Sequence, residues 1–224
     1  MKLHEYPDRE LMHLSVADRI TSQLADFLRR GEGATLAVPG GETPGPVFDI
    51  LSGADLDWGR VTVMPTDERW APPGVEPANQ RLLRERLLTG RAEAAHAFPL
   101  SVPEANGPEA AASTLCTRVA ALLPISVLIL GMGLDGHVAS LLVGGDHLGE
   151  ALGPDAPAVM AMRSDAAAET RLTLSLPALR SAFNMHLVIA GKAKRETLER
   201  AARKPVEEAP VRAILDLATI HWAE

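Results

Sequence analysis

The strongest constraint on the fold is a short apolar run that ends in glycines. Residues 125–130, ISVLIL, are apolar on both faces and predict a buried strand of a parallel sheet. A tight turn that brings backbone close to a ligand can follow, because glycines recur at Gly131, Gly133 and Gly136. Asp135 and His137 lie in this turn, at the carboxyl end of the strand, where open α/β sheets bind ligands. The segment therefore predicts an acid/base pair at a binding site.

Apolar strands alternate with amphipathic helices along the rest of the chain. Strands are expected at 34–38, 61–64, 94–100, 159–162, 171–174, 186–190 and 218–222, with the fourth and fifth forming a hairpin-like return. Helices are expected at 16–28, 78–88, 108–122, 191–203 and 210–215. This alternation predicts one α/β domain over residues 1–224, with a mostly parallel sheet and helices on both faces.

Glycine, proline and charge predict several connections. Gly31 is expected to end the first helix, and Thr43 and Pro44 to open another as N-cap and first residue. A proline-rich loop is expected after Arg69, and a glycine- and acid-rich surface loop at 144–157.

Charge and cysteine content narrow the class of partner. The 224 residues include 22 Lys and Arg against 29 Asp and Glu, and the net charge of −7 disfavours nucleic acid and anionic membranes. Cys116 is the single cysteine, so no internal disulfide and no cysteine-based zinc site are expected, which suits a reducing cytosol. The first ten residues lack the apolar core of a signal peptide, and the most apolar region, 119–134, is too short to span a membrane. We therefore expect a cytoplasmic protein, a monomer or a homodimer.

Residues 131–136, GMGLDG, also match the glycine fingerprint of dinucleotide-binding folds. That fingerprint opens a long helix, usually in the first strand–helix unit of a chain. Here only a short helix, HVASLLV, is expected before Gly144 and Gly145. A nicotinamide cofactor is therefore disfavoured.

For Asp135 and His137 the alternative interpretation is structural. Taken alone, they would be the N-cap and a first-turn residue of this short helix. Their position at the end of a buried strand, together with the segments below, favours a functional site instead.

A second glycine turn, VPGGETP at 38–44, lies between an expected strand and an expected helix. Free N–H groups and the dipole of the helix favour a phosphate at such a turn. An ordinary strand–helix turn is the alternative. Glu42 weakens the phosphate interpretation, because a carboxylate repels a phosphate unless it points away or binds a sugar hydroxyl.

Charged residues also stand near other expected elements. The segment 66–69, TDER, follows a strand and reaches the same sheet edge, although alone it is expected to be a solvated charged turn. Arg171 begins an apolar strand. Lys194 lies in the first turn of a helix, where a cation opposes the dipole unless an anion is bound. A solvated lysine is the alternative at Lys192 and Lys194.

Together and in order, these segments resemble the 6-phosphogluconolactonase family, relatives of the glucosamine-6-phosphate deaminases. The matching segments are PGGETP (39–44), TDERW with Asn79 (66–79), LGMGLDGHVASLL (130–142), RLTLSLPAL (171–179), GKAK (191–194) and HW (221–222). The resemblance covers nearly the whole chain, and the block at 130–142 is the most specific. It implies a modified doubly wound α/β sandwich that hydrolyses a small phosphosugar lactone, 6-phospho-D-glucono-1,5-lactone, to 6-phosphogluconate in the oxidative pentose phosphate pathway. It also implies that no metal or organic cofactor is needed.

The resemblance implies roles for the site residues. His137 is the expected general base, since histidine ionises near neutral pH, and Asp135 would orient its imidazole or the attacking water. Arg69 would hold the substrate's oxygens or the oxyanion, and Asp67 would accept a sugar hydroxyl. The phosphate would be held by two cations and by backbone groups, namely Arg171, Lys194, Gly40, Gly41 and Thr43.

Water is expected to attack directly, without a covalent intermediate. The chain contains no G-x-S-x-G nucleophile elbow. Ser140 is expected one helical turn after His137, where it could be proposed as a nucleophile. We predict that it packs or caps instead, and that no acyl-enzyme forms.

Two rivals remain open from the sequence. The glucosamine-6-phosphate deaminases are similar in the glycine turn and in D-G-H, but carry a glutamate five residues after the histidine and a tyrosine after Asp-Glu. This chain has Leu142 and Arg69 at those positions, and both differences favour the lactonase. Glu42 stands where the lactonases usually have a small hydroxyl residue. A non-catalytic sugar-phosphate sensor on the same fold is therefore the rival of a different class.

Overall fold

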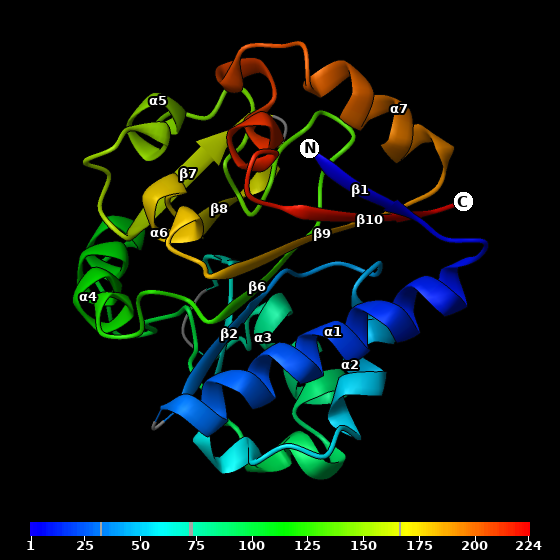
Figure 1. Ribbon diagram of the computed structural model, residues 1–224. Coiled ribbons are helices and arrows are strands. Elements are labelled where there is room, and N and C mark those ends of the chain that lie inside the picture. The colour runs from blue at the N-terminus through cyan, green and yellow to red at the C-terminus, as the bar shows by residue number, and fades with distance from the viewer. Residues whose placement is uncertain (32, 72–73, 166) are drawn as a thin grey trace.

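Parallel strands form the main sheet of the structure, a computed structural model that describes residues 1–31, 33–71, 74–165 and 167–224. The sheet has seven strands in the order β1-β10-β9-β6-β2-β3-β5 (Figure 1), all paired in parallel. The strands are β1 (Lys2–Glu5), β2 (Ala34–Val38), β3 (Val61–Pro65), β5 (His96–Ala97), β6 (Val127–Leu130), β9 (Asn184–Ala190) and β10 (Thr219–Ala223). The mostly parallel α/β fold predicted from the sequence is confirmed.

Helices cover both faces of this sheet, again as predicted. The helices α1 (Arg9–Arg30) and α2 (Gly45–Ser52) lie on one face, and α7 (Lys192–Ala201) lies on the other (Figure 1). Successive residues of β6 point to opposite cores, with Val127 and Ile129 toward α1 and Leu128 and Leu130 toward the other face. A strand buried on both faces explains the unbroken apolar run. The remaining helices are α3 (Ala78–Leu82), which continues into a π-helical turn at Leu83–Leu87, α4 (Pro108–Ala120), α5 (Leu148–Leu152) and α6 (Leu176–Arg180).

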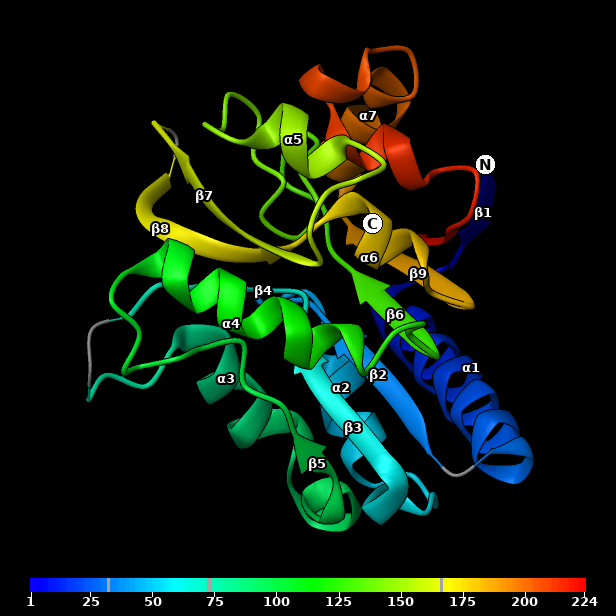
Figure 2. The ribbon, with the colours of Figure 1, turned by 90° about the vertical axis from the view of Figure 1, so that its left-hand side faces the viewer.

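A second, antiparallel sheet lies beside the first. It contains β4 (Asp67–Arg69), β8 (Ala167–Leu174) and β7 (Val159–Ser164), in that order. Figure 2 shows β7 and β8 as a long curved pair with α4 alongside. The hairpin-like return is confirmed, but the prediction of a solvated turn at 66–69 is wrong. Asp67 and Glu68 are 8% and 0% exposed, because hydrogen bonds described below compensate their burial.

The segment after His137 is not the short helix that the sequence predicted. Residues 137–147 form turns, so Asp135 is not an N-cap and Ser140 does not lie one helical turn after the histidine. Ala139 interrupts any helix here, since its φ of 49° is left-handed; among the described residues it is the one non-glycine with a positive φ. This conformation costs roughly 1–2 kcal/mol. Contacts elsewhere must therefore hold it.

Other connections differ from the prediction in detail. Helix α2 begins at Gly45, whose amide closes a turn onto the Glu42 carbonyl (3.1 Å), and no side chain caps it, so Thr43 is not the N-cap. The loop predicted at 144–157 contains α5, because Leu148 and Ala151 pack into the core. The segment at 210–215 forms a 3₁₀ helix, Pro210–Ile214, with further 3₁₀ turns at Trp58–Arg60, Gly90–Ala94 and Val206–Glu208.

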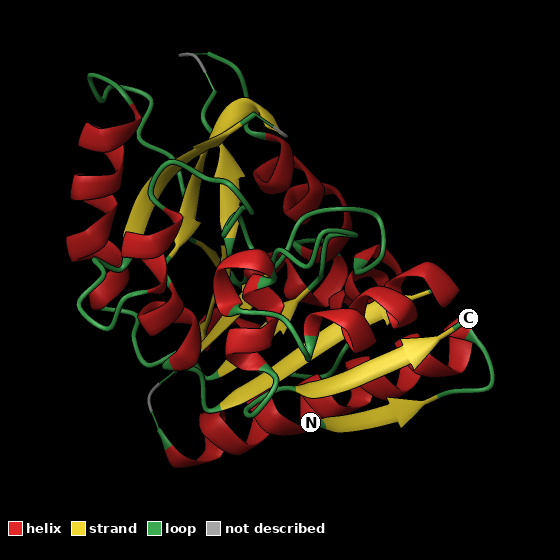
Figure 3. Cartoon of the chain, turned by 90° about the horizontal axis from the view of Figure 1, so that it is seen from above, coloured by secondary structure: helices red, strands yellow, loops and turns green. Residues whose placement is uncertain are grey.

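The ends of the chain are paired with each other. Strand β1 was not predicted, since K-L-H-E lacks an apolar alternation, yet it pairs with β10 at the sheet edge. Figure 3 shows these two strands side by side. The strand expected at 94–100 shortens to β5, and Pro72 and Pro73 of the expected proline-rich loop lie outside the described residues. Within the part of the chain that is described, no helix has the length and apolar character that a membrane crossing needs.

The strand order creates a switch point between β2 and β6. The chain runs outward from β2 through β3 and β5, then returns through α4 to β6 on the other side of β2. Connections that leave neighbouring strands in opposite directions open a crevice at the carboxyl ends of those strands. The turn at 39–44 follows β2, and the turn at 131–137 follows β6. Both glycine turns therefore meet at the crevice.

Candidate functional site

A cavity of about 340 Å³ opens at the switch point, within the usual size range of small-molecule sites. It is lined by the turns after β2 and β6, the end of β9, the start of α7 and strands β4 and β8. The structure brings almost all predicted site residues to its wall: Gly40, Gly41, Thr43, Asp67, Arg69, His137, Arg171 and Lys194. Asp135 is not among the lining residues but is hydrogen-bonded to His137.

Asp135 and His137 form a hydrogen-bonded pair in the turn after β6. The Oδ1 atom of Asp135 lies 2.7 Å from Nδ1 of His137 and also accepts the His137 backbone N–H at 3.2 Å. The bond to His137 lowers the pKa of Asp135 to about 2, although desolvation acts in the opposite direction. A carboxylate can only accept, so Nδ1 carries a proton, and in the neutral form of the ring the basic nitrogen is therefore Nε2.

Gly133 makes room for this pair. A Cβ atom at this position would lie 2.2 Å from His137 Nδ1 and 2.3 Å from Asp135 Oδ1. The Gly133 amide also donates to the His137 carbonyl at 2.9 Å. Any side chain here would displace the acid/base pair, so this glycine is required by close approach.

The cations of the site come from α7 and from the second sheet. Lys194 donates to the carbonyl of Met132, which ties α7 to the turn that carries His137. Burial lowers the pKa of Lys194, and the charge of Asp135 partly opposes that shift. The lysine side chain is therefore poised to gain from an anion in the cavity.

Arg69 and Arg171 are direct cross-strand partners in the β4–β8 ladder. Like charges in directly opposed positions repel each other. Glu169 pairs with Arg69 at 2.8 Å, whereas the buried Nε of Arg171 has no hydrogen-bond partner among the residues described. The pair therefore presents an excess of positive charge to the cavity.

Glu68 is buried rather than solvated, and it holds three backbone amides near the site. Its Oε1 accepts the amides of Arg69 (2.8 Å) and Asn79 (3.1 Å), and its Oε2 accepts the amide of Gln80 (2.8 Å). Burial raises the pKa of Glu68, and these three amides oppose that shift. The carboxylate thus caps α3 from a separate strand.

Asn79, at the start of α3, then reaches the turn after β2. Its Nδ2 donates to the Asp67 carbonyl at 2.7 Å, and a Cβ on Gly40 would lie 2.0 Å from its Oδ1. Gly41 needs glycine for a different reason, a φ of +89° with open space around it. Glu42 lies beside it on the cavity wall and is exposed.

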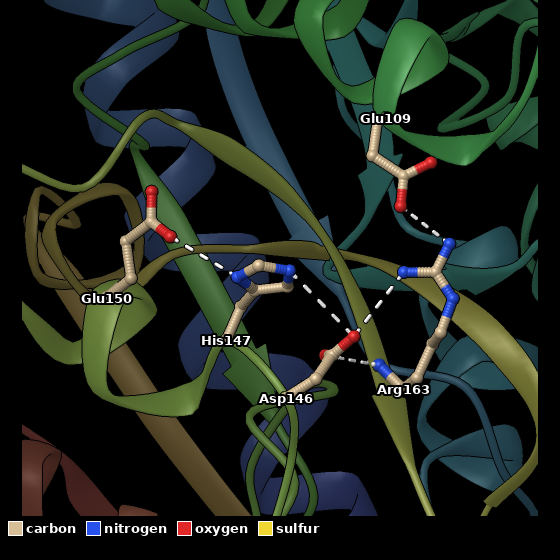
Figure 4. Close-up of polar contacts among 5 residues, drawn as sticks. All are labelled: Glu109, Asp146, His147, Glu150 and Arg163. Atoms are coloured by element: carbon tan, nitrogen blue, oxygen red, sulfur yellow. Dashed lines mark hydrogen bonds and ion pairs between the residues drawn. The ribbon is translucent and has the colours of Figure 1, made fainter.

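The C-terminal end of the loop at 137–147 is held by the exposed network of ion pairs and hydrogen bonds in Figure 4. Arg163 and Asp146 exchange backbone and side-chain bonds, including Arg163 N–H to Asp146 Oδ1 at 2.8 Å. Arg163 also pairs with Glu109 at 2.5 Å, and His147 lies 3.4 Å from Glu150. These groups join the loop to β7, α4 and α5.

The described residues form neither a typical metal site nor a typical dinucleotide site. No three of their His, Cys, Asp or Glu side chains gather closely enough to hold a metal ion. The turn at 131–136 leads into no helix, so it lacks the helix N-terminus on which the pyrophosphate of a dinucleotide would rest. The charged and titratable groups that line the cavity include His137, Arg69, Arg171 and Lys194.

Comparison with known proteins places this geometry in a family. Residues 7–222 match the model of the family described as glucosamine-6-phosphate isomerases/6-phosphogluconolactonase. A 6-phosphogluconolactonase from Rhizobium meliloti is 39% identical, covering 99% of this chain and 98% of that one, and one from Pseudomonas aeruginosa is 39% identical over 92% and 87%. The crystal structure of a 6-phosphogluconolactonase from Shewanella baltica superimposes with a TM-score of 0.95 at 29% identity, covering 100% and 98%. The chain therefore belongs to the glucosamine-6-phosphate isomerase/6-phosphogluconolactonase family, as its motifs indicated.

Proposed function

We propose that this chain hydrolyses 6-phospho-D-glucono-1,5-lactone to 6-phosphogluconate, a step of the oxidative pentose phosphate pathway. One observation carries the proposal. The His137 imidazole, backed by Asp135, lines the same cavity as the cations Arg171 and Lys194. Relatives named 6-phosphogluconolactonase match the chain over nearly its whole length and support the same activity.

His137 is the general base in this proposal. With Nδ1–H donated to Asp135, Nε2 takes a proton from a water that attacks the lactone carbonyl at C1. The carbonyl oxygen becomes an oxyanion, which Arg69 stabilises. When the bond from C1 to the ring oxygen breaks, the imidazolium returns the proton to that oxygen, and the open-chain acid leaves. General-base help is worth about 10²–10⁴-fold, so positioning and oxyanion stabilisation supply the remainder.

The phosphate of the substrate lies, in this proposal, between the turn at 39–44 and two cations. Arg171 has an unpartnered buried Nε, and an anion would favour the charged form of Lys194 against the burial that lowers its pKa. Gly40, Gly41 and Thr43 offer backbone contacts. Asp67 accepts a sugar hydroxyl. A phosphate anchored at the far end of the sugar positions C1 near His137.

The structure favours hydrolysis over the deaminase chemistry of the same family. Leu142 stands where the deaminases carry a glutamate, and its side chain is 7% exposed within the core. The lining of the cavity does not include it. A sugar-phosphate sensor would need the cations but not an aligned acid/base pair, so the 2.7 Å contact between Asp135 and His137 favours an enzyme.

Turnover tests the proposed function. Fresh lactone is added to the protein in weak buffer, acid release is followed, and the spontaneous hydrolysis in buffer alone is subtracted. We expect a rate well above this background. A protein rate equal to the buffer rate would refute the proposal.

We propose further that the enzyme acts in the cytosol without a metal ion. The single cysteine, Cys116, supports a reducing compartment. Treatment with EDTA is expected to leave the excess rate unchanged. If activity were lost and one metal restored it, Asp135 and His137 would have to be reconsidered as metal ligands.

A further inference from the structure

We propose that Ser140 is a positioning residue for this reaction. It holds the carboxylate of Asp67 and the turn that carries His137 in a fixed relation around the cavity. The inference rests on the proposed hydrolysis. Ser140 is 2% exposed and follows Ala139, which lines the cavity, and it bonds to Asp67 from 73 residues away in the sequence.

Two hydroxyl groups fix the Asp67 carboxylate. Ser140 Oγ donates to Oδ2 at 2.5 Å, and Thr66 Oγ1 donates to Oδ1 at 3.0 Å. Each carboxylate oxygen thus accepts one bond from a side chain that is at most 2% exposed. Charge-assisted bonds of this kind are short and directional, so they set the plane in which Asp67 faces the substrate.

The backbone amide of Ser140 makes a second hydrogen bond, to another residue of the β4–β8 ladder. It donates to Thr173 Oγ1 at 3.1 Å, and Thr173 is the strand partner of Asp67 in the β4–β8 ladder. Ser140 therefore bonds to two opposed residues of one ladder, through its hydroxyl and its amide. These bonds hold the left-handed Ala139, which separates Ser140 from the segment of His137. Movement of Ser140 would shift Asp67 and His137 relative to each other.

The same contacts argue against Ser140 as a nucleophile. Its hydroxyl proton is donated to Asp67, its side chain is buried, and the residues that line the cavity include Ala139 but not Ser140. A nucleophile must present its oxygen to the carbonyl carbon. The role left for the hydroxyl is to orient its neighbours.

Ser140→Ala tests this role, because it removes the hydroxyl and keeps the amide bond to Thr173. We expect kcat to fall between about 10-fold and 100-fold, the scale of a small misplacement of reacting groups. The Kd for inorganic phosphate, measured by calorimetry, should stay within about twofold, since the phosphate contacts are untouched. Ser140→Cys keeps a weak donor and should recover part of kcat.

Ser126→Ala is the matched control. Ser126 is also buried, at 6% exposure, and its Oγ accepts the Thr35 amide at 3.0 Å, away from the lining of the cavity. Its loss should lower Tm without lowering kcat. Equal losses of kcat in the two variants would show a general effect of destabilisation and overturn the proposal.

A double-mutant cycle separates positioning from other effects. In an Asp67→Asn background, Ser140→Ala should change kcat by no more than about twofold, because the partner through which it acts is already altered. A full additional loss in that background would overturn the proposal, as would wild-type kcat in Ser140→Ala alone.

A burst of acyl-enzyme in the wild type, absent in Ser140→Ala, would make Ser140 a nucleophile instead. If the wild type shows no turnover, the proposed hydrolysis itself is refuted. If the wild type is active and Ser140→Ala has the same kcat, only the positioning role of Ser140 is refuted.

Discussion

The loop at 137–147 is held at two places by contrasting chemistry. Near the cavity, Ser140 is tied to Asp67 and Thr173 by bonds between residues at most 8% exposed. At the far end, Asp146 and Arg163 belong to an exposed network whose side chains are 36–62% accessible (Figure 4). Both anchors are polar, and the outer one has more charges.

The two anchors differ in whether water can replace their hydrogen bonds and ion pairs when these break. Exposed ion pairs contribute about 0–1 kcal/mol, because solvent screens them and competes for the same groups. Buried hydrogen bonds have no such substitute, so a broken one leaves an unsatisfied group and permits a shift. We infer that the inner anchor sets the geometry of the reaction, whereas the outer anchor mainly ties the loop to the surface.

Gly133→Ala should produce the largest effect among the changes that compare the two ends. The new Cβ would overlap Asp135 and His137 at 2.2–2.3 Å, so we expect kcat to fall by about 10²-fold or more. Gly149→Ala is the control at the outer end, since nothing lies within 4 Å of its Cβ position in α5. Steady-state kinetics on fresh lactone measures both. Similar kcat values for the two variants would contradict the close-approach argument.

The lowered pKa of Lys194 predicts that ligand binding in the cavity depends on pH. Burial lowers its pKa, so the ammonium loses its proton at a lower pH than an ordinary lysine, and phosphate affinity falls as pH rises through that value. Loss of this charged contact should weaken the binding of 6-phosphogluconate about tenfold, as calorimetry from pH 7 into the alkaline range would show. Lys194→Arg keeps its charge and should bind almost independently of pH there. The same alkaline loss in both proteins would rule Lys194 out as the titrating group.

Glu42→Ser should have a smaller effect, confined to binding. If the carboxylate faces the phosphate, its removal lowers KM by about two- to fivefold, the size of a surface charge interaction. Glu104→Ser, at an exposed glutamate outside the cavity lining, should leave KM unchanged. An unchanged or higher KM for Glu42→Ser would show that this carboxylate points away from the phosphate.

Arg163→Ala should have the smallest effect, although it removes two ion pairs at once. Both pairs are exposed, so we expect a loss of stability of at most about 1–2 kcal/mol and a kcat within about twofold of the wild type. Urea unfolding and steady-state kinetics test the two parts. A loss of kcat as large as that of Ser140→Ala would erase the contrast between the anchors.

The sequence could predict features that depend on neighbouring residues, but not those that depend on contacts between residues far apart in the chain. The strand at 127–130 is a local feature, and its unbroken apolar run was sufficient to predict it. The pair Asp135–His137 was proposed as a site only because it follows that strand and because other segments of the chain supported the same interpretation. Glu68 looked like a solvated charge because the amides of Asn79 and Gln80, which compensate its burial, lie 11 and 12 residues away. The sequence shows no sign of that compensation.

Ser140 shows the same limit at longer range. The bond to Asp67 spans 73 residues, and the spacing after His137 suggested a helix. Tertiary contacts override that local preference by holding Ala139 in a left-handed conformation. Strand β1 was missed for a related reason, since pairing with β10 at the sheet edge, rather than its own pattern, makes it a strand.

In the proposed mechanism His137, oriented by Asp135, activates the water that opens the lactone. The most direct measurement compares wild type and His137→Ala for hydrolysis of fresh lactone above background, with the Kd for 6-phosphogluconate measured on the same preparations. We predict that kcat falls by about 10²–10⁴-fold while this Kd changes little. Full activity in His137→Ala would contradict the mechanism, even in an active member of the family.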